Sequence, residues 1–170
     1  MTKKYMILVW FAIIGSLVLA SPAIIIDGKH YTSMGQSPSV LVYDGVSVSY
    51  VFSANGKNSI ELGGNFSFVS PISSGEYFRE DSFNTVIKVH GGQIYDFTNE
   101  SSLGLRVISR VGLVTANFDK FGLFYSIAPV FYVRVGFLSF GICAGLEIAQ
   151  FFGGDTLPVF HAGGEITYRF

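Results

Sequence analysis

The segment Phe121–Arg134, F-G-L-F-Y-S-I-A-P-V-F-Y-V-R, alternates bulky apolar residues with small or polar ones. The apolar set is Phe121, Leu123, Tyr125, Ile127, Phe131 and Val133, and the other includes Gly122, Ser126, Ala128 and Arg134. A period of two residues is typical of a β-strand whose two faces lie in different surroundings. The segment is therefore predicted to be a strand with one strongly apolar face.

The same alternation covers most of the chain. Six further segments show it, beginning at Val46, Ile60, Phe83, Leu103, Leu138 and Phe160. Asn55-Gly56, between the first two, is a strong signal for a tight hairpin turn. Ile24–Met34 fits an additional strand poorly, because Asp27, Lys29 and His30 blur its alternation. Counting it gives eight strands, and an even number lets an antiparallel sheet close with both chain ends on one side.

The composition indicates what surrounds these strands. The chain has 170 residues, a net charge of −1, 49% hydrophobic residues and only 14% charged residues. Soluble domains have about 25% charged residues, so this composition argues against a soluble enzyme, a disordered protein and a nucleic-acid binder. Beyond the first two dozen residues there is no long apolar run, which argues against a protein of several membrane helices.

The small residues of the polar face suit the crowded interior of a narrow barrel, and the bulky face suits lipid. Strands of this length also cover the about 9–11 residues that a membrane strand needs. The sequence predicts an all-β fold, an eight-stranded antiparallel transmembrane β-barrel. The alternative is a soluble secreted sandwich or lipocalin-like barrel, in which the apolar face would form the core.

The N-terminus predicts export. Lys3 and Lys4 precede the apolar stretch Met6–Leu19, and small residues follow. This order is typical of a cleaved secretory signal peptide, with a retained helical anchor as the alternative. We therefore expect a signal peptide over residues 1–23 and a barrel domain over 24–170. The short connections alternate with longer ones such as Ser70–Ser82, and bacterial barrels expose their longer loops outside the cell.

The chain ends in Ile166-Thr167-Tyr168-Arg169-Phe170, with apolar residues at alternate positions and a terminal aromatic residue. With the signal peptide and the alternating strands, this ending resembles the small eight-stranded outer-membrane proteins of Gram-negative bacteria, of the Ail/OmpX/PagC kind with the Opa adhesins nearby. The resemblance implies a monomer in the cell outer membrane, in contact with its lipid and lipopolysaccharide. It also implies recognition of Phe170 by the outer-membrane assembly machinery, and loops that contact a host or extracellular protein.

Inside the barrel we expect a paired charge network. Its predicted members are Glu61, Lys88, Arg106, Arg110, Glu147 and Glu165, joined by His90, Asp96, Arg134 and Arg169 on the same inward faces. A fully hydrogen-bonded network fixes one arrangement of buried charges, and a closed interior follows from it. The alternative is a narrow ion path lined by the same charges.

The loops are the best candidates for function. Ser70–Ser82 is net acidic and has Tyr77 and Phe78 at its centre, followed by Arg79. Exposed aromatic residues beside charges are typical anchors of protein contacts, so these three residues are the predicted ligand-binding site. The alternative is that Tyr77 and Phe78 belong to the aromatic girdle at the membrane surface.

No catalytic group is recognisable. His90 and His161 face inward, no strand places a histidine and a serine two residues apart on one face, and no G-x-S-x-G is present. Cys143, the single cysteine, is predicted to be a small inward filler. The sequence thus predicts a non-enzymatic barrel without metal or cofactor that displays loops for adhesion, host interaction or envelope protection. The alternatives are a lipid A-modifying barrel enzyme and a narrow pore.

Three smaller features carry structural predictions. Pro129 is expected to mark a bulge because proline removes a donor from the sheet. The pairs Gly63-Gly64, Gly91-Gly92 and Gly163-Gly164 are expected to allow strand curvature and close approach between strands. Phe151 and Phe152 are expected in the aromatic girdle.

Overall fold

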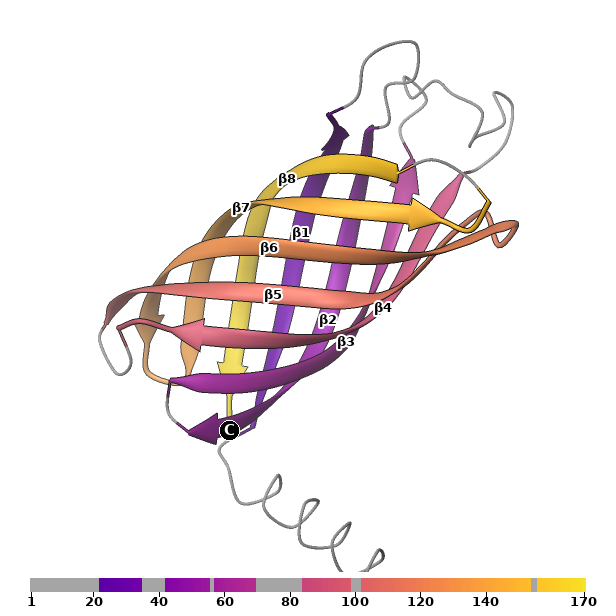
Figure 1. Cartoon of the computed structure of the whole chain (residues 1–170). Coiled ribbons are helices and arrows are strands. Elements are labelled where there is room, and N and C mark those ends of the chain that lie inside the picture. The colour runs from indigo at the N-terminus through magenta and orange to yellow at the C-terminus, as the bar shows by residue number, and fades with distance from the viewer. Residues whose placement is uncertain (1–21, 35–41, 56, 70–83, 99–101, 154–155) are drawn as a thin grey trace, which may run out of the picture.

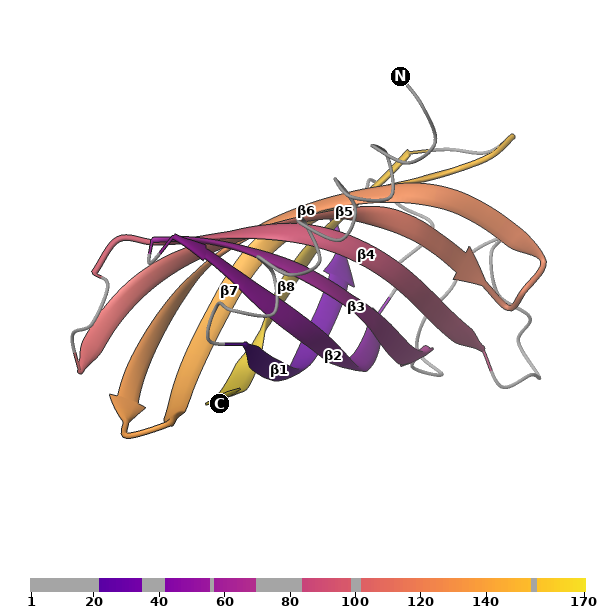
Figure 2. The same cartoon turned by 90° about the horizontal axis from the view of Figure 1, so that it is seen from below.

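The computed structural model describes residues 22–34, 42–55, 57–69, 84–98, 102–153 and 156–170. These residues form eight strands: β1 (Ala23–Ser33), β2 (Val42–Asn55), β3 (Asn58–Val69), β4 (Thr85–Asp96), β5 (Leu103–Ala116), β6 (Lys120–Val135), β7 (Leu138–Phe151) and β8 (Thr156–Arg169). All neighbouring strands are antiparallel, and β1 pairs with β8, so the sheet closes into a barrel. The predicted fold is confirmed. Figures 1 and 2 show the tilted strands curving round from β1 to β8.

The strand that the sequence supported least, Ile24–Met34, is β1, and it closes the barrel. Asp27 and Lys29 point inward and are buried, whereas Gly28 and His30 face outward. Charges therefore occupy the face where other strands carry mostly small residues, and after Ile26 the outward face carries Gly28, His30 and Thr32 in place of bulky apolar residues. This exchange explains why the alternation of β1 was hard to recognise.

The connections alternate between the two ends of the barrel. The strand pairs β2–β3, β4–β5 and β6–β7 are joined at what we call the short-turn end, where Gly136 has a φ of +61° that favours glycine. The other connections lie at the opposite, long-connection end. Ala23 pairs with Arg169, so the start of β1 and the C-terminus both lie at the short-turn end (Figure 1).

Pro129 does not mark a bulge, and that prediction was wrong. The register between β6 and β7 is the same on both sides of it, from Ile127 opposite Leu146 to Val130 opposite Cys143. Pairing with β7 is interrupted at Pro129 without any extra residue, because a missing donor removes a hydrogen bond but leaves the strand geometry intact.

The glycine pairs lie where strands approach closely, as predicted. A Cβ atom added to Gly163 would meet the backbone oxygen of Gly28 at 2.0 Å, and one on Gly63 would meet that of Val48 at 2.6 Å. The partner Gly164 faces outward, and the nearest atom to its added Cβ would be 3.6 Å away. One glycine of such a pair is therefore required by packing, and the other is not.

Candidate functional site

The six charged residues expected inside the barrel are buried there and form three ion pairs. Lys88 Nζ lies 2.5 Å from Glu147 Oε1, and Arg110 Nε lies 2.6 Å from Glu61 Oε1. Arg106 pairs with Glu165 and also donates to Thr167 Oγ1 at 2.6 Å. Because a charge left unpaired in such surroundings is costly, the three pairs constrain which strands lie opposite one another across the interior.

The pair between Arg110 and Glu61 belongs to a larger group that includes residues of β1. Arg110 Nη1 lies 3.0 Å from Asp27 Oδ2, and Lys29 Nζ lies 3.5 Å from Asp27 Oδ1. Asp27 and Lys29 were not predicted as interior charges. The blurred alternation of Ile24–Met34 was the signal that could have found them, because these two residues cause it together with His30.

Toward the long-connection end, Lys88 is enclosed by aromatic rings. Its Nζ lies 4.2 Å from the centroid of the Tyr31 ring, and it donates to Tyr43 Oη at 3.1 Å. The rings of Tyr31 and Tyr43 stack with their centroids 4.4 Å apart. Tyr43 Oη in turn donates to Glu147 at 3.2 Å, so the ammonium, the carboxylate and the phenol satisfy one another.

Toward the short-turn end, Asp96 accepts a hydrogen bond from Tyr132 Oη at 2.7 Å. Arg134 lies 3.9 Å from the same carboxylate and is less buried, with 15% of its side chain exposed. Arg169 is half-buried. The charges at this end are therefore held more loosely than those at the centre.

Around Lys88 and Glu147, these layers leave little open space inside the barrel. The cavity between Lys88, His90, Arg110 and Glu147 has a volume of about 10 Å³. That is about the minimum for one water molecule. His90 contacts Ser49 Oγ through Nε2 at 3.1 Å, and both His90 and His161 are buried inside as expected. This part of the interior is filled by side chains.

The outer wall has the opposite character. Its outward side chains are mostly large and apolar, as at Val46, Leu62, Val111 and Ile142, all more than half exposed. Among the described residues, no helix is long and apolar enough to cross a membrane.

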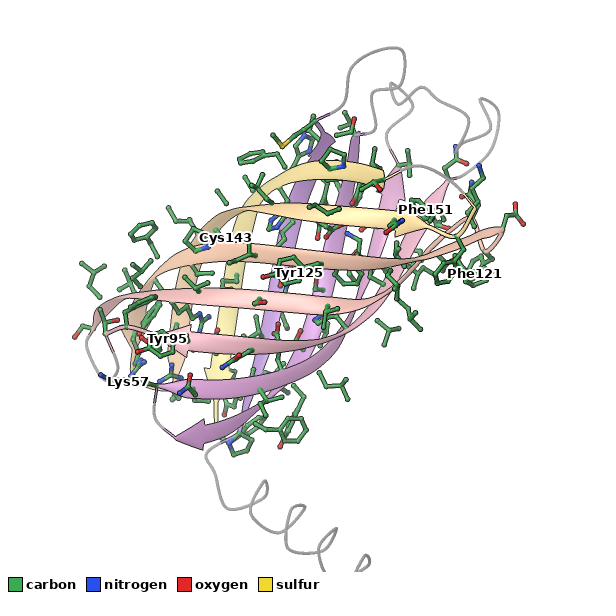
Figure 3. All side chains as sticks on the ribbon, in the orientation of Figure 1. Lys57, Tyr95, Phe121, Tyr125, Cys143 and Phe151 are labelled. Atoms are coloured by element: carbon green, nitrogen blue, oxygen red, sulfur yellow. The ribbon has the colours of Figure 1, made fainter. Side chains whose placement is uncertain are left out.

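Aromatic residues form girdles at both ends of this wall. At the short-turn end, edge-to-face pairs join Tyr50 to Phe52, Tyr95 to Phe97 and Tyr168 to Phe170. At the long-connection end lie the pair Phe66 and Phe68 and the exposed Phe118, Phe121 and Phe152. Figure 3 shows Tyr95 and Phe121 at opposite ends of the barrel. Two aromatic girdles flanking an apolar band are typical of transmembrane barrels.

Other predicted residues had different outcomes. Tyr77, Phe78 and Arg79 lie outside the described residues, as do residues 1–21 of the expected signal peptide. Phe152 is exposed at the girdle, but Phe151 points inward and is buried, so its assignment to the girdle was wrong. The reason is the strict alternation of β7, which gives two consecutive residues opposite faces. Cys143 is buried on the inward side, as expected.

The closed sheet, the apolar wall and the two girdles define a small eight-stranded transmembrane β-barrel of the outer-membrane type. No family model and no curated protein matches the chain in sequence. Neisserial surface protein A has a similar structure, with a TM-score of 0.65 at 9% identity over 88% of this chain and 97% of that one. Ail, the attachment invasion locus protein of Yersinia pestis, has a TM-score of 0.56 at 17% identity over 89% of this chain and 100% of that one.

A third similar structure is the outer membrane enzyme PagL, with a TM-score of 0.52 at 11% identity over 84% of this chain and 97% of that one. The predicted resemblance to small Ail-like outer-membrane barrels, and with it the outer-membrane localisation, is confirmed at the level of the fold.

Proposed function

We propose that the barrel is a closed scaffold in the outer membrane whose loops at the long-connection end contact a host or extracellular protein or protect the envelope. The observation that supports this most is the filled interior around Lys88 and Glu147. A cavity of about 10 Å³ among paired charges is not a path for solutes. We therefore assign the proposed function to the exposed loops at the long-connection end.

The orientation supports the same proposal. Short turns in barrels of this type face the periplasm and longer loops face the outside. The expected contact residues Tyr77, Phe78 and Arg79 belong to the segment that joins β3 to β4 at the long-connection end. They would thus be presented to the surroundings of the cell.

The test is binding of bacteria that display the protein to cultured host cells and to immobilised extracellular-matrix proteins. We expect a variant with Tyr77→Ala and Phe78→Ala to lose most of this binding. The matched control is Phe118→Ala and Phe152→Ala, which removes two exposed aromatic residues at the same end but outside Ser70–Ser82. Undiminished binding by the first variant would refute the contact site.

The closed interior is tested separately by single-channel conductance in planar bilayers. We expect no steady conductance above that of the bare membrane. A stable ohmic channel would support the alternative of a narrow pore.

A further inference from the structure

A polar group on the outer wall lies apart from the interior network. His30 and Thr32 are two residues apart on β1 and face outward together, and Asp44 lies directly opposite His30 on β2. The side chains of His30 and Asp44 are 57% and 71% exposed. Ionisable residues directed at lipid are costly, and in membrane proteins they mark functional sites more often than structural ones.

The three side chains are joined in the order hydroxyl, imidazole, carboxylate. His30 Nδ1 lies 2.8 Å from Asp44 Oδ1, and Thr32 Oγ1 lies 3.4 Å from His30 Nε2. With Asp44 accepting from Nδ1–H, the lone pair of Nε2 is directed at the hydroxyl. This is the arrangement of a nucleophile, a general base and a residue that orients the base. A nucleophile–base distance of this length is common without substrate and shortens when substrate binds.

An apolar groove adjoins the group. It has a volume of about 540 Å³, and its lining includes His30, Asp44, Val46, Phe66, Phe68 and Ala162. Gly28 also lines it, and a Cβ added there would meet no atom within 4 Å. Because Gly28 has no side chain and Ala162 a small one, the outer wall is hollowed there, beside the bulky side chains of Val46 and Phe66.

The position of the groove identifies what can fill it. It lies on the lipid-facing wall, toward the long-connection end, which faces the outer leaflet in barrels of this type. The molecules in contact with that wall are lipids. Their acyl chains are apolar, and carboxylic ester bonds near the membrane surface join these chains to the rest of the lipid. An acyl chain lying in the groove would bring such an ester to His30, which lines the groove, and to Thr32, two residues further along β1.

We propose that the barrel hydrolyses acyl esters of outer-leaflet lipids, with Thr32 as nucleophile, His30 as general base and Asp44 as the positioning residue. Thr32 Oγ1 forms a bond to the ester carbonyl carbon while its proton passes to His30 Nε2. The bond to the lipid alcohol oxygen breaks, and His30 gives that oxygen the proton. Water then attacks the acyl-threonine, its proton passes through His30 to Thr32 Oγ1, and a fatty acid is released.

A lipid A-modifying enzyme was an alternative from the sequence, but no catalytic group was predicted for it, because no strand carries a histidine and a serine two residues apart. The hydroxyl here belongs to a threonine, and it lies in the segment whose alternation is least regular. The orienting carboxylate comes from a different strand, and only the register of β1 against β2 places it opposite His30.

The test uses the full chain purified from outer membranes and reconstituted into vesicles of phosphatidylethanolamine, with or without lipopolysaccharide. Released fatty acid is identified by mass spectrometry, and protein-free vesicles give the background. We expect release above background, and the acyl chain released shows whether phospholipid or lipopolysaccharide is the source. Release at background level from both kinds of vesicle would overturn the proposal.

The variants assign the roles. We expect Thr32→Val and His30→Gln to lower the release about 100-fold or more, because general-base catalysis contributes at least that factor. Thr32→Ser is expected to retain activity, and Asp44→Glu to retain more than Asp44→Asn. Ser109→Ala is the matched control, because Ser109 is another outward hydroxyl, bonded to Tyr125 at 3.3 Å. Wild-type release by Thr32→Val would refute the assigned nucleophile.

A covalent probe gives a second readout that does not depend on turnover. A long-chain alkyl fluorophosphonate should form a bond between its phosphorus and Thr32 Oγ1, with loss of fluoride and transfer of the hydroxyl proton to His30. We expect peptide mass spectrometry to find the phosphonyl group on residue 32 in the wild type and in Thr32→Ser. Equal labelling of the Thr32→Val variant would count against the site. Heat-modifiable gel mobility checks that each variant is folded.

Discussion

Inside the barrel, Arg110 lies between Glu61 and Asp27, and all three are buried. On the outer wall, His30 and Asp44 form a pair of similar length whose side chains are more than half exposed. The inner group is explained by burial, since each charge there needs its partners. The outer pair has no such explanation, because an apolar residue would suit either position at lower cost. The same chemistry therefore serves stability in one region and, in our proposal, reactivity in the other.

The strongest test of this difference between the inner group and the outer pair is to remove the cation of the inner group. Arg110→Met leaves Glu61 and Asp27 without their guanidinium partner, which should cost about 3–5 kcal/mol of unfolding free energy, toward the upper end of that range. The measurement is urea unfolding in lipid vesicles, in which circular dichroism and gel mobility follow the loss of the folded barrel. The control is Arg134→Met, whose partner Asp96 lies 3.9 Å away in a more exposed layer. Equal losses in the two variants would contradict the special role of the central group.

A second variant pair separates the cost of an unpaired charge from the worth of an ion pair. Lys88→Met alone leaves Glu147 buried beside Tyr43, and we expect a loss of about 3 kcal/mol. The double variant Lys88→Met with Glu147→Leu removes both charges and should recover most of that loss, because apolar replacements of a buried pair are often neutral. A double variant as unstable as the single one would show that the pair itself stabilises the barrel.

Glycine substitutions compare the two faces of one strand. Gly163→Ala directs a methyl group against the backbone of β1, 2.0 Å from the oxygen of Gly28, and overpacking of this kind costs about 1–3 kcal/mol. Gly164→Ala, one residue later, directs the methyl group outward, where the backbone oxygen of Gly141 would lie at 3.6 Å in ordinary van der Waals contact, and should change stability little. Urea unfolding of the two variants measures the difference. Similar stabilities would show that β1 and β8 can move apart at this point.

The sequence predicts more about the interior group than about the outer-wall group. Strict alternation in β6 and β7 predicted the faces of their residues correctly except for Phe151 at the end of β7, because a period of two leaves no choice of face. It also assigned Glu61, Lys88 and Glu147 to the interior. It did not identify which charges meet, because that depends on the stagger between strands around the closed barrel.

The outer-wall group could not be found in this way for a related reason. His30 and Asp44 are far apart in the sequence, and their pairing depends on the register between β1 and β2. In β1 the alternation was obscured by Asp27, Lys29 and His30, and the burial of Asp27 depends on Arg110 from β5. Patterns within one strand predict faces, whereas contacts between strands need the whole sheet.

The smallest expected effect on stability is at the outer wall, and it sharpens the comparison most. His30→Gln breaks an exposed pair, and such pairs contribute about 0–1 kcal/mol, so urea unfolding should barely change. The same variant is expected to lose acyl-ester hydrolysis about 100-fold. The two measurements on one protein distinguish a reactive group from a structural one. A stability loss as large as that of Arg110→Met, with hydrolysis unaffected, would mean that His30 and Asp44 serve to join β1 to β2 and that the two regions do not differ in kind.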